Sequence, residues 1–399
     1  MSFNVAVLGF GTVGSGVAEV LSMNRDSIAR KTGKDIVLKH ILDLRDFPDS
    51  PYASLVTHNA DEVFGDSELN VAVETIGGAR IAYEYTRRAL TAGISVVTSN
   101  KELVSTHGVE LLKLAEEHNC SYLFEAAVGG GIPIIRPLYK CLAANKIIRI
   151  AGIVNGTTNY ILSKMKEEGI SYGDALKQAQ DNGFAEANPS ADVDGIDAQR
   201  KLSILSTIAL DGNYIAPDRI RTEGISSLTL DDIKFERKIG CELKLIAYYE
   251  NRGGLPSVYV APHYVSSSNL LSSVGGVFNA ISVEGNALGE SLFYGQGAGM
   301  LPTASAVCGD IAEVAVTGGV PSEPRLWKDE GTEIACYDDV EASIVVRADG
   351  NLTELSAAFK GYKFRTLGVD AILVESIAHR DIGALVSKVN GAKWLHYLA

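Results

Sequence analysis

The chain has 399 residues, of which 46% are hydrophobic and 21% charged, a composition typical of a globular rather than a disordered protein. Its length favours two or three domains over a single core. The net charge of −13 argues against a nucleic-acid-binding protein, which needs a basic surface, and no apolar run approaches the ~18 residues that cross a membrane.

Residues 1–130 alternate predicted strands with predicted helices. Short apolar runs such as FNVAVLGF, NVAVETIGG and SVVTSN are separated by helical patterns such as RIAYEYTRRALTAG. This alternation predicts an α/β domain with a Rossmann-type, doubly wound parallel sheet. Much later in the chain, a glycine-rich loop leads into a long predicted helix. We expect residues 300–318 of this segment to pack on the same domain.

The segment GFGTVG follows the first predicted strand and opens a predicted helix. Its Gly9, Gly11 and Gly14 match the G-x-G-x-x-G pattern, in which the glycines allow a tight turn, close approach of a pyrophosphate and close helix–sheet packing. The helix N-terminus adds partial positive charge for the phosphates. A glycine turn without a ligand is the alternative, and the strand–helix context favours a dinucleotide site.

The end of the second predicted strand, ILDLRD, bears on the choice of dinucleotide. Asp43 can accept hydrogen bonds from a free ribose 2′-hydroxyl, which favours NAD. Arg45 can pair with a 2′-phosphate, which favours NADP. A surface turn that carries both charges for solubility is a third interpretation, so the sequence leaves the choice between NAD and NADP open.

Residues 131–299 show hairpin-like spacing that predicts an α+β domain with a mixed or antiparallel sheet. Within this region, ADVDGIDAQRKLSIL runs from an acidic segment into an apolar helix. If the helix starts near Asp194, Asp197 and Lys201 are four residues apart and share a face. An exposed pair of this kind is worth only ~0.3–0.5 kcal/mol, whereas a lysine held toward a substrate oxygen can transfer a proton.

The last part of the chain begins after a stretch rich in proline and charge, which predicts a linker over residues 319–335. Residues 336–399 then show a small β-α-β-α pattern. The five cysteines are scattered without a disulfide or zinc pattern, and Met1 leads directly into a predicted strand rather than a signal peptide. We therefore expect a cytoplasmic protein.

Several segments, in this order, resemble the homoserine dehydrogenase family from residue 5 to about residue 318. They are GFGTVG, VETIGG, TSNKELV, EAAVGGGIPIIRPL, NGTTNYIL, AEANPSADVDGIDAQRKLSIL and GQGAGMLPTASAVCGD. The resemblance implies NAD(P)-dependent reduction of L-aspartate 4-semialdehyde to L-homoserine, on the route to threonine and methionine. Because the chain opens on the glycine loop, we expect a monofunctional enzyme without an N-terminal kinase.

The resemblance also implies roles for particular residues. Lys201 matches the family's acid–base lysine, Asp197 its carboxylate partner, and Lys101 a second acid–base candidate. Residues matching substrate contacts are Glu186, Asp192, Thr157 and Gly156. Residues matching cofactor contacts are Gly9, Phe10, Gly11, Thr12, Val13, Gly14, Asp43, Arg45, Thr75, Ser99, Lys101 and Gly297. Residues matching a monovalent cation site, usually for Na⁺, are Glu125, Val128, Gly130 and Ile132, three of them acting largely through backbone oxygens; a tight loop without an ion is the alternative.

The resemblance further implies a substrate-binding and dimerisation domain over residues 131–299 and a homodimer or higher homo-oligomer. Residues 336–399 resemble a short ACT-like regulatory module, although ADGNLTEL departs from the usual D-x-P-G-x-L and the pattern looks shorter than a full β-α-β-β-α-β unit. Two other functions remain open: a non-catalytic dinucleotide or amino-acid sensor, and a dehydrogenase of another amino-acid aldehyde. A sensor has no need of a proton donor, so the combination of Glu186, Asp197, Lys201 and Lys101 favours an enzyme.

Overall fold

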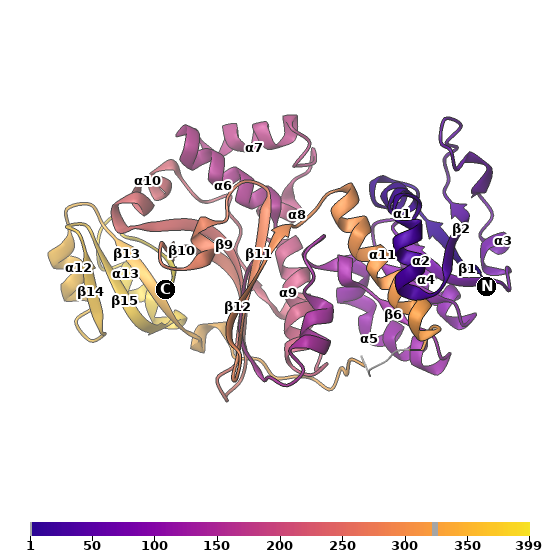
Figure 1. Ribbon diagram of the computed structural model, residues 1–399. Coiled ribbons are helices and arrows are strands. Elements are labelled where there is room, and N and C mark those ends of the chain that lie inside the picture. The colour runs from indigo at the N-terminus through magenta and orange to yellow at the C-terminus, as the bar shows by residue number, and fades with distance from the viewer. Residues whose placement is uncertain (1, 321–325) are drawn as a thin grey trace. The chain divides into compact units, whose positions relative to one another are not determined.

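The computed structural model describes residues 2–320 and 326–399. Its contacts divide the chain into two compact units (Figure 1). The first consists of Met1–Ala144, Ser203–Pro217 and Gly295–Thr332, and the second of Asn145–Leu202, Asp218–Tyr294 and Glu333–Ala399. No helix in the described ranges is both long and apolar enough to span a membrane.

The first unit contains a six-stranded, all-parallel sheet in the order β3-β2-β1-β4-β5-β6. Its strands are β1 (Ser2–Leu8), β2 (Asp35–Leu42), β3 (Val56–Thr57), β4 (Leu69–Glu74), β5 (Ser95–Thr98) and β6 (Tyr122–Leu123). Its helices are α1 (Thr12–Met23), α2 (Arg25–Thr32), α3 (Ala60–Phe64), α4 (Arg80–Thr91), α5 (Lys101–Glu117) and α11 (Met300–Thr317). The predicted Rossmann-type parallel sheet is confirmed.

The core of this unit explains why its strands are almost continuously apolar. Val5, Val7 and Val73 are fully buried because helices cover the central strands. Helix α11 belongs to the same core through Val307 and Ile311, although nearly 300 residues separate it from β1 along the chain.

The second unit contains a ten-stranded mixed sheet, as the sequence predicts. Its order is β12-β11-β7-β9-β10-β16-β13-β15-β14, with β8 also paired to β10. The strands are β7 (Ile147–Ile153), β8 (Arg221–Thr222), β9 (Cys241–Glu250), β10 (Ser257–Ser266), β11 (Phe278–Gly285), β12 (Gly289–Gln296), β13 (Glu341–Arg347), β14 (Phe364–Leu367), β15 (Ala371–Ala378) and β16 (Lys393–Leu398). The helices are α6 (Gly156–Glu168), α7 (Tyr172–Asp181), α8 (Ser190–Val193), α9 (Ile196–Ala209, which continues into the first unit), α10 (Leu230–Ile239), α12 (Leu352–Ala358) and α13 (His379–Val386).

The C-terminal strands belong to this same sheet. Their element order is β13-α12-β14-β15-α13-β16, and the strands lie in the order β16-β13-β15-β14 with every neighbouring pair antiparallel. This is a full β-α-β-β-α-β unit, so the shorter β-α-β-α pattern was wrong. The predicted pattern lacked two strands, β14 and β16. Strand β14 was missed because FRTL lies at the sheet edge, where its residues are exposed or half-buried and show no apolar alternation. The predicted linker over residues 319–335 lies partly outside the described residues, and the ACT-like assignment stays a prediction.

Three buried histidines join the C-terminal strands to the rest of the sheet. Strand β16 pairs with β10 through only three residue pairs, one of them His263 with His396. The two imidazole rings stack with centroids 4.7 Å apart, and His379 Nε2 lies 2.8 Å from His396 Nε2. Burial lowers the pKa of His263 to about 4 and lowers the pKa values of His379 and His396. These histidines are therefore neutral in the folded protein at pH 7.

This histidine cluster is expected to make stability pH-dependent. Because its folded pKa lies below the unfolded value of ~6.5, His263 binds fewer protons when folded. Its contribution is complete above pH ~6.5 and is lost as the pH falls toward 4. We expect the free energy of unfolding, measured with urea, to fall by about 2 kcal/mol between pH 7 and 5 from His263 alone. The His263→Phe variant should show a shallower pH dependence, and an unchanged dependence would contradict this role.

Candidate active site

The glycine loop forms a tight turn at the end of β1. Gly9 has φ +91°, and a Cβ there would come within 2.9 Å of the Thr75 carbonyl oxygen; a Cβ on Gly14 would overlap the Gly9 carbonyl oxygen. A Cβ on Gly11, in contrast, would meet nothing within 4 Å. Gly11 is the N-cap of α1 and has no side chain that could accept hydrogen bonds from the amides of the first turn. This open cradle at a helix N-terminus fits a pyrophosphate.

The two glycines should therefore respond differently to a methyl group. Gly11→Ala is expected to leave the thermal stability of the free protein nearly unchanged but to weaken dinucleotide binding, because the added Cβ occupies the space for the pyrophosphate. Gly14→Ala is expected to lower stability by about 1–3 kcal/mol, because the Cβ overlaps backbone. Thermal unfolding and dinucleotide titration by fluorescence measure both effects. Equal loss of stability in the two variants would contradict the open cradle.

Asp43 is fixed beside the glycine loop. Its Oδ2 accepts a hydrogen bond from the Phe10 amide at 2.7 Å, and its Oδ1 accepts one from the Arg45 amide at 2.9 Å. The Arg45 guanidinium also folds back onto the carboxylate at 3.1 Å. Partial burial acts to raise the pKa of Asp43, but the hydrogen bonds from Arg45 and Phe10 outweigh it and lower the pKa to about 2. Asp43 and Arg45, the two residues expected to meet the ribose of the dinucleotide, thus form an ion pair with each other.

The ends of β4 and β5 form a second part of the site, centred on a residue that the sequence reasoning missed. Buried Glu74 accepts hydrogen bonds from the Thr98 hydroxyl at 2.6 Å and the Ile76 amide at 2.8 Å, and burial raises its pKa. The Thr75 hydroxyl donates to the Gly9 carbonyl oxygen at 2.7 Å, which ties β4 to the glycine loop. A carboxylate at the end of the apolar run NVAVE was the available sequence signal.

Lys101 is the first residue of α5. The preceding Asn100 caps this helix by accepting a hydrogen bond from the Leu103 amide at 3.1 Å, and its side-chain amide donates to the Gly78 carbonyl oxygen at 2.7 Å. Ser99, half-buried, lies in the same turn. The turn that carries Ser99 and Lys101 is therefore fixed against the β4 turn.

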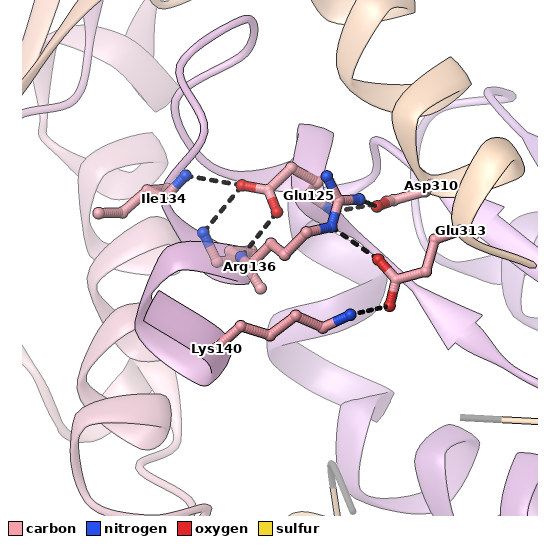
Figure 2. A network of polar contacts seen from close by, with 7 residues as sticks. Glu125, Ile134, Arg136, Lys140, Asp310 and Glu313 are labelled. Atoms are coloured by element: carbon pink, nitrogen blue, oxygen red, sulfur yellow. Dashed lines mark hydrogen bonds and ion pairs between the residues drawn. The ribbon is translucent and has the colours of Figure 1, made fainter. Parts of the chain in front are cut away.

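Glu125 is the centre of a buried polar network (Figure 2). Its carboxylate accepts hydrogen bonds from three successive backbone amides, at 2.6 Å from Ile134, 2.9 Å from Ile135 and 2.7 Å from Arg136. Its own amide donates to Asp310 of α11 at 2.8 Å. The Arg136 guanidinium pairs with Asp310 and, at 2.6 Å, with Glu313. This network fixes residues 125–136 to α11.

The loop matched to a cation site makes a tight turn next to the segment around Gly297. Gly129 and Gly130 both have positive φ, and a Cβ on Gly130 would overlap the Gly297 carbonyl oxygen, so these two segments lie side by side within the first unit. Val128 and Ile132, the other residues of the predicted cation site, are buried in the same segment. No cluster of three or more acidic, His or Cys side chains suited to a metal occurs in the described ranges.

The second unit holds a buried Asp–Lys pair. Lys201 Nζ donates to Asp197 Oδ2 and to the Val154 carbonyl oxygen, both at 2.7 Å. The two residues are 9% and 5% exposed, so they are not the exposed helix pair that was one interpretation of the sequence. Lysine and aspartate lie one turn apart on α9, as the spacing predicts.

Asn155, which the sequence reasoning also missed, ties this pair to the start of α6. Its side-chain amide donates to Asp197 Oδ2 at 2.8 Å and to Asp192 Oδ1 at 2.7 Å. Its side-chain oxygen accepts from the Thr158 amide at 2.8 Å and thereby caps α6. Two carboxylates and one ammonium are therefore held around a helix N-terminus.

The other residues predicted to contact the substrate are held by fewer contacts. Gly156 is the first residue of α6, and the Thr157 hydroxyl donates to the Phe184 carbonyl oxygen at 2.7 Å. Glu186 is exposed, and within the described residues its carboxylate has no hydrogen-bond or ion-pair partner. Its carboxylate is thus available to a ligand.

Comparisons with known proteins agree along most of the chain. A family profile described as homoserine dehydrogenase matches residues 133–312, and one described as the homoserine dehydrogenase NAD binding domain matches residues 9–125. Homoserine dehydrogenase of Bacillus subtilis is 37% identical over 92% of this chain and 87% of its own length. That of Neisseria gonorrhoeae is 42% identical over 78% of this chain and 72% of its own length.

Solved structures give the same result. The crystal structure of a homoserine dehydrogenase from Thiobacillus denitrificans superimposes with a TM-score of 0.91 at 34% identity, covering 100% of this chain and 98% of that one. A hyperthermophilic archaeal homoserine dehydrogenase in complex with NADPH superimposes with a TM-score of 0.67 at 31% identity, covering 80% of this chain and 99% of that one. The chain therefore belongs to the homoserine dehydrogenase family.

Proposed function

We propose that this chain catalyses the NAD(P)-dependent interconversion of L-homoserine and L-aspartate 4-semialdehyde, with Lys201 as the acid–base group. The observation that supports this role is the buried Lys201 ammonium, which two acceptors hold in place. An ammonium has three N–H donors, and Asp197 and Val154 use two of them. The third serves the substrate oxygen.

Proton transfer is the chemistry that these side chains supply. The bound nicotinamide accepts or supplies the hydride. In the direction of reduction, Lys201 donates a proton to the carbonyl oxygen as negative charge develops there. In the direction of oxidation, Lys201 removes the hydroxyl proton. Asp197 orients the amine, and Lys101 is the second acid–base candidate.

Substrate binding uses the groups around α6. The exposed carboxylate of Glu186 and the carboxylate of Asp192 bind the α-ammonium group of homoserine. The backbone amides of Gly156 and Thr157, at the N-terminus of α6, bind its α-carboxylate, because a helix N-terminus favours an anion.

The first unit supplies the dinucleotide site. Gly9, Gly11 and Gly14, with Phe10, Thr12 and Val13, cradle the pyrophosphate, and Asp43 and Arg45 meet the ribose. Thr75, Ser99 and Gly297 complete the contacts near the nicotinamide, and a Na⁺ ion at the carbonyls of Glu125, Val128, Gly130 and Ile132 supports the loop.

The protein is proposed to work in the cytoplasm as a homodimer or higher homo-oligomer built through residues 131–299, with residues 336–399 as an ACT-like module.

The test is the initial rate of L-homoserine oxidation, measured separately with NAD and NADP at the absorbance of the reduced nicotinamide. Turnover with at least one dinucleotide is the expected result. A protein that binds dinucleotide without turnover would instead be a sensor, and turnover only with other amino-acid alcohols would make it a dehydrogenase of another aldehyde. A faster rate with NAD would show that Asp43 determines the choice of dinucleotide, and a faster rate with NADP would show that Arg45 does.

A further inference from the structure

The second unit contains a cavity that none of the proposed catalytic or cofactor residues line. It has a volume of about 270 Å³, slightly below the ~300–1,000 Å³ typical of ligand pockets, so it suits a small molecule. Its walls come from α6, α10, the start of β9 and the turn at Ser272 and Ser273. The lining residues that matter for charge are Lys166, Glu236, Glu242 and Lys244.

Two of these charged side chains are almost completely buried. Glu236 is 1% exposed and Lys244 is 4% exposed. Glu236 Oε2 accepts a hydrogen bond from the Leu243 amide at 2.6 Å, but Oε1 has no hydrogen-bond partner within the described residues. The nearest cation, Lys166 Nζ, lies 3.8 Å from Oε1 and makes its close contact with Glu242 instead. A buried carboxylate oxygen without a donor is costly, and a ligand that donates to it removes this cost.

Lys244 presents the opposite charge to the same cavity. Its Nζ donates to the Val274 carbonyl oxygen at 2.6 Å and to Asn159 Oδ1 at 3.3 Å, which leaves one of its three hydrogens for a ligand. Lys244 and Glu236 form no ion pair with each other, since the described ion pair of Glu236 is with Lys166. Among the described residues, Lys244 therefore has no ion-pair partner, and Glu236 has only the long contact of 3.8 Å with Lys166.

We propose that this cavity binds a small zwitterion of the size of a free α-amino acid, whose ammonium group donates to Glu236 and whose carboxylate accepts from Lys244. A simple anion would leave Glu236 without a donor, and a simple amine would leave Lys244 without a counter-charge. Ser163, Ser272 and Ser273 also line the cavity.

The pKa values of the two buried side chains agree with this assignment. Burial raises the pKa of Glu236 to about 7 and lowers the pKa of Lys244 to about 8. Both groups are thus partly neutral near pH 7 to 8, and a zwitterion that pairs with both would favour their charged forms. Glu236 loses a proton and Lys244 gains one on becoming charged, so binding should release protons at pH 7, where Glu236 dominates, and take up protons at pH 8, where Lys244 dominates.

The experiment is thermal unfolding and calorimetry of the full chain with the twenty proteinogenic L-amino acids as probes. At least one amino acid is expected to raise Tm by roughly 3 °C at ten times its Kd, whereas the matching amine without the carboxylate and the matching acid without the ammonium are not. The calorimetric heat should depend on the ionisation enthalpy of the buffer.

Four variants separate this cavity from the active site. Glu236→Gln keeps the shape and the Leu243 contact but is expected to weaken binding roughly ten-fold or more, and Lys244→Met should do the same. Glu354→Gln, an exposed residue of α12, is the matched control. Binding that survives Glu236→Gln but disappears in Glu186→Gln would place the ligand in the substrate site and overturn the proposal. The absence of any amino-acid-specific shift, an equal response to the acid alone, or a change of oligomeric state in Glu236→Gln would also overturn it.

Discussion

Replacement of Lys201 by methionine is expected to lower kcat for L-homoserine oxidation by about 10²–10⁴-fold, the contribution of a positioned acid–base side chain. Methionine keeps the length and apolar stem of lysine but cannot transfer a proton. The substitution leaves the dinucleotide site in the first unit unchanged, so the Kd for NAD(P) should stay near the value of the unsubstituted protein. Steady-state rates and a dinucleotide titration measure the two quantities.

Lys164→Met is the matched control, because Lys164 lies on α6 of the same unit and forms surface ion pairs at 3.3 Å with Glu167 and 3.0 Å with Glu168, besides a contact of 5.8 Å with the Tyr160 ring. Its kcat should stay within about two-fold of the unsubstituted value, since exposed pairs contribute ~0–1 kcal/mol. Full activity of Lys201→Met, together with loss of activity in Lys101→Met, would transfer the acid–base role to Lys101.

The second large effect is expected at Glu125. Glu125→Ala removes the acceptor of three buried backbone amides, each of which costs ~1–3 kcal/mol when it lacks a partner. We expect the free energy of unfolding of the first unit to fall by about 3 kcal/mol or more, measured by urea denaturation followed by circular dichroism. Glu117→Ala, at an exposed ion pair of α5, is the control and should change stability by less than ~1 kcal/mol.

The ionic conditions of this measurement distinguish two roles for Glu125. If the carboxylate acts only on the backbone amides, the loss of stability is the same in sodium chloride and in choline chloride. A loss that appears only in sodium chloride would show that the side chain itself binds the cation, and it would contradict the network described above.

The features that the sequence predicted well depend on neighbours in the chain. The glycine turn follows directly from the spacing of Gly9, Gly11 and Gly14, and the parallel sheet follows from continuous apolar strands. The shared face of Asp197 and Lys201 follows from the geometry of one helix turn.

The features that the sequence missed depend on distant contacts. Whether Asp197 and Lys201 are exposed or buried is decided by Asn155 and Val154, more than 40 residues away. The Glu125 carboxylate accepts hydrogen bonds from the amides of residues 134–136, and no pattern of residue types encodes that contact. Strand β14 is recognised only by its pairing with β15.

A crystal structure of the ternary complex with L-homoserine and a nicotinamide dinucleotide tests the central assignment most directly. The expected result is Lys201 Nζ within hydrogen-bond distance, about 2.7–3.2 Å, of the homoserine side-chain oxygen, while its bond to Asp197 is kept. A complex in which that oxygen instead contacts Lys101, with Lys201 separated from the substrate by other side chains, would contradict it.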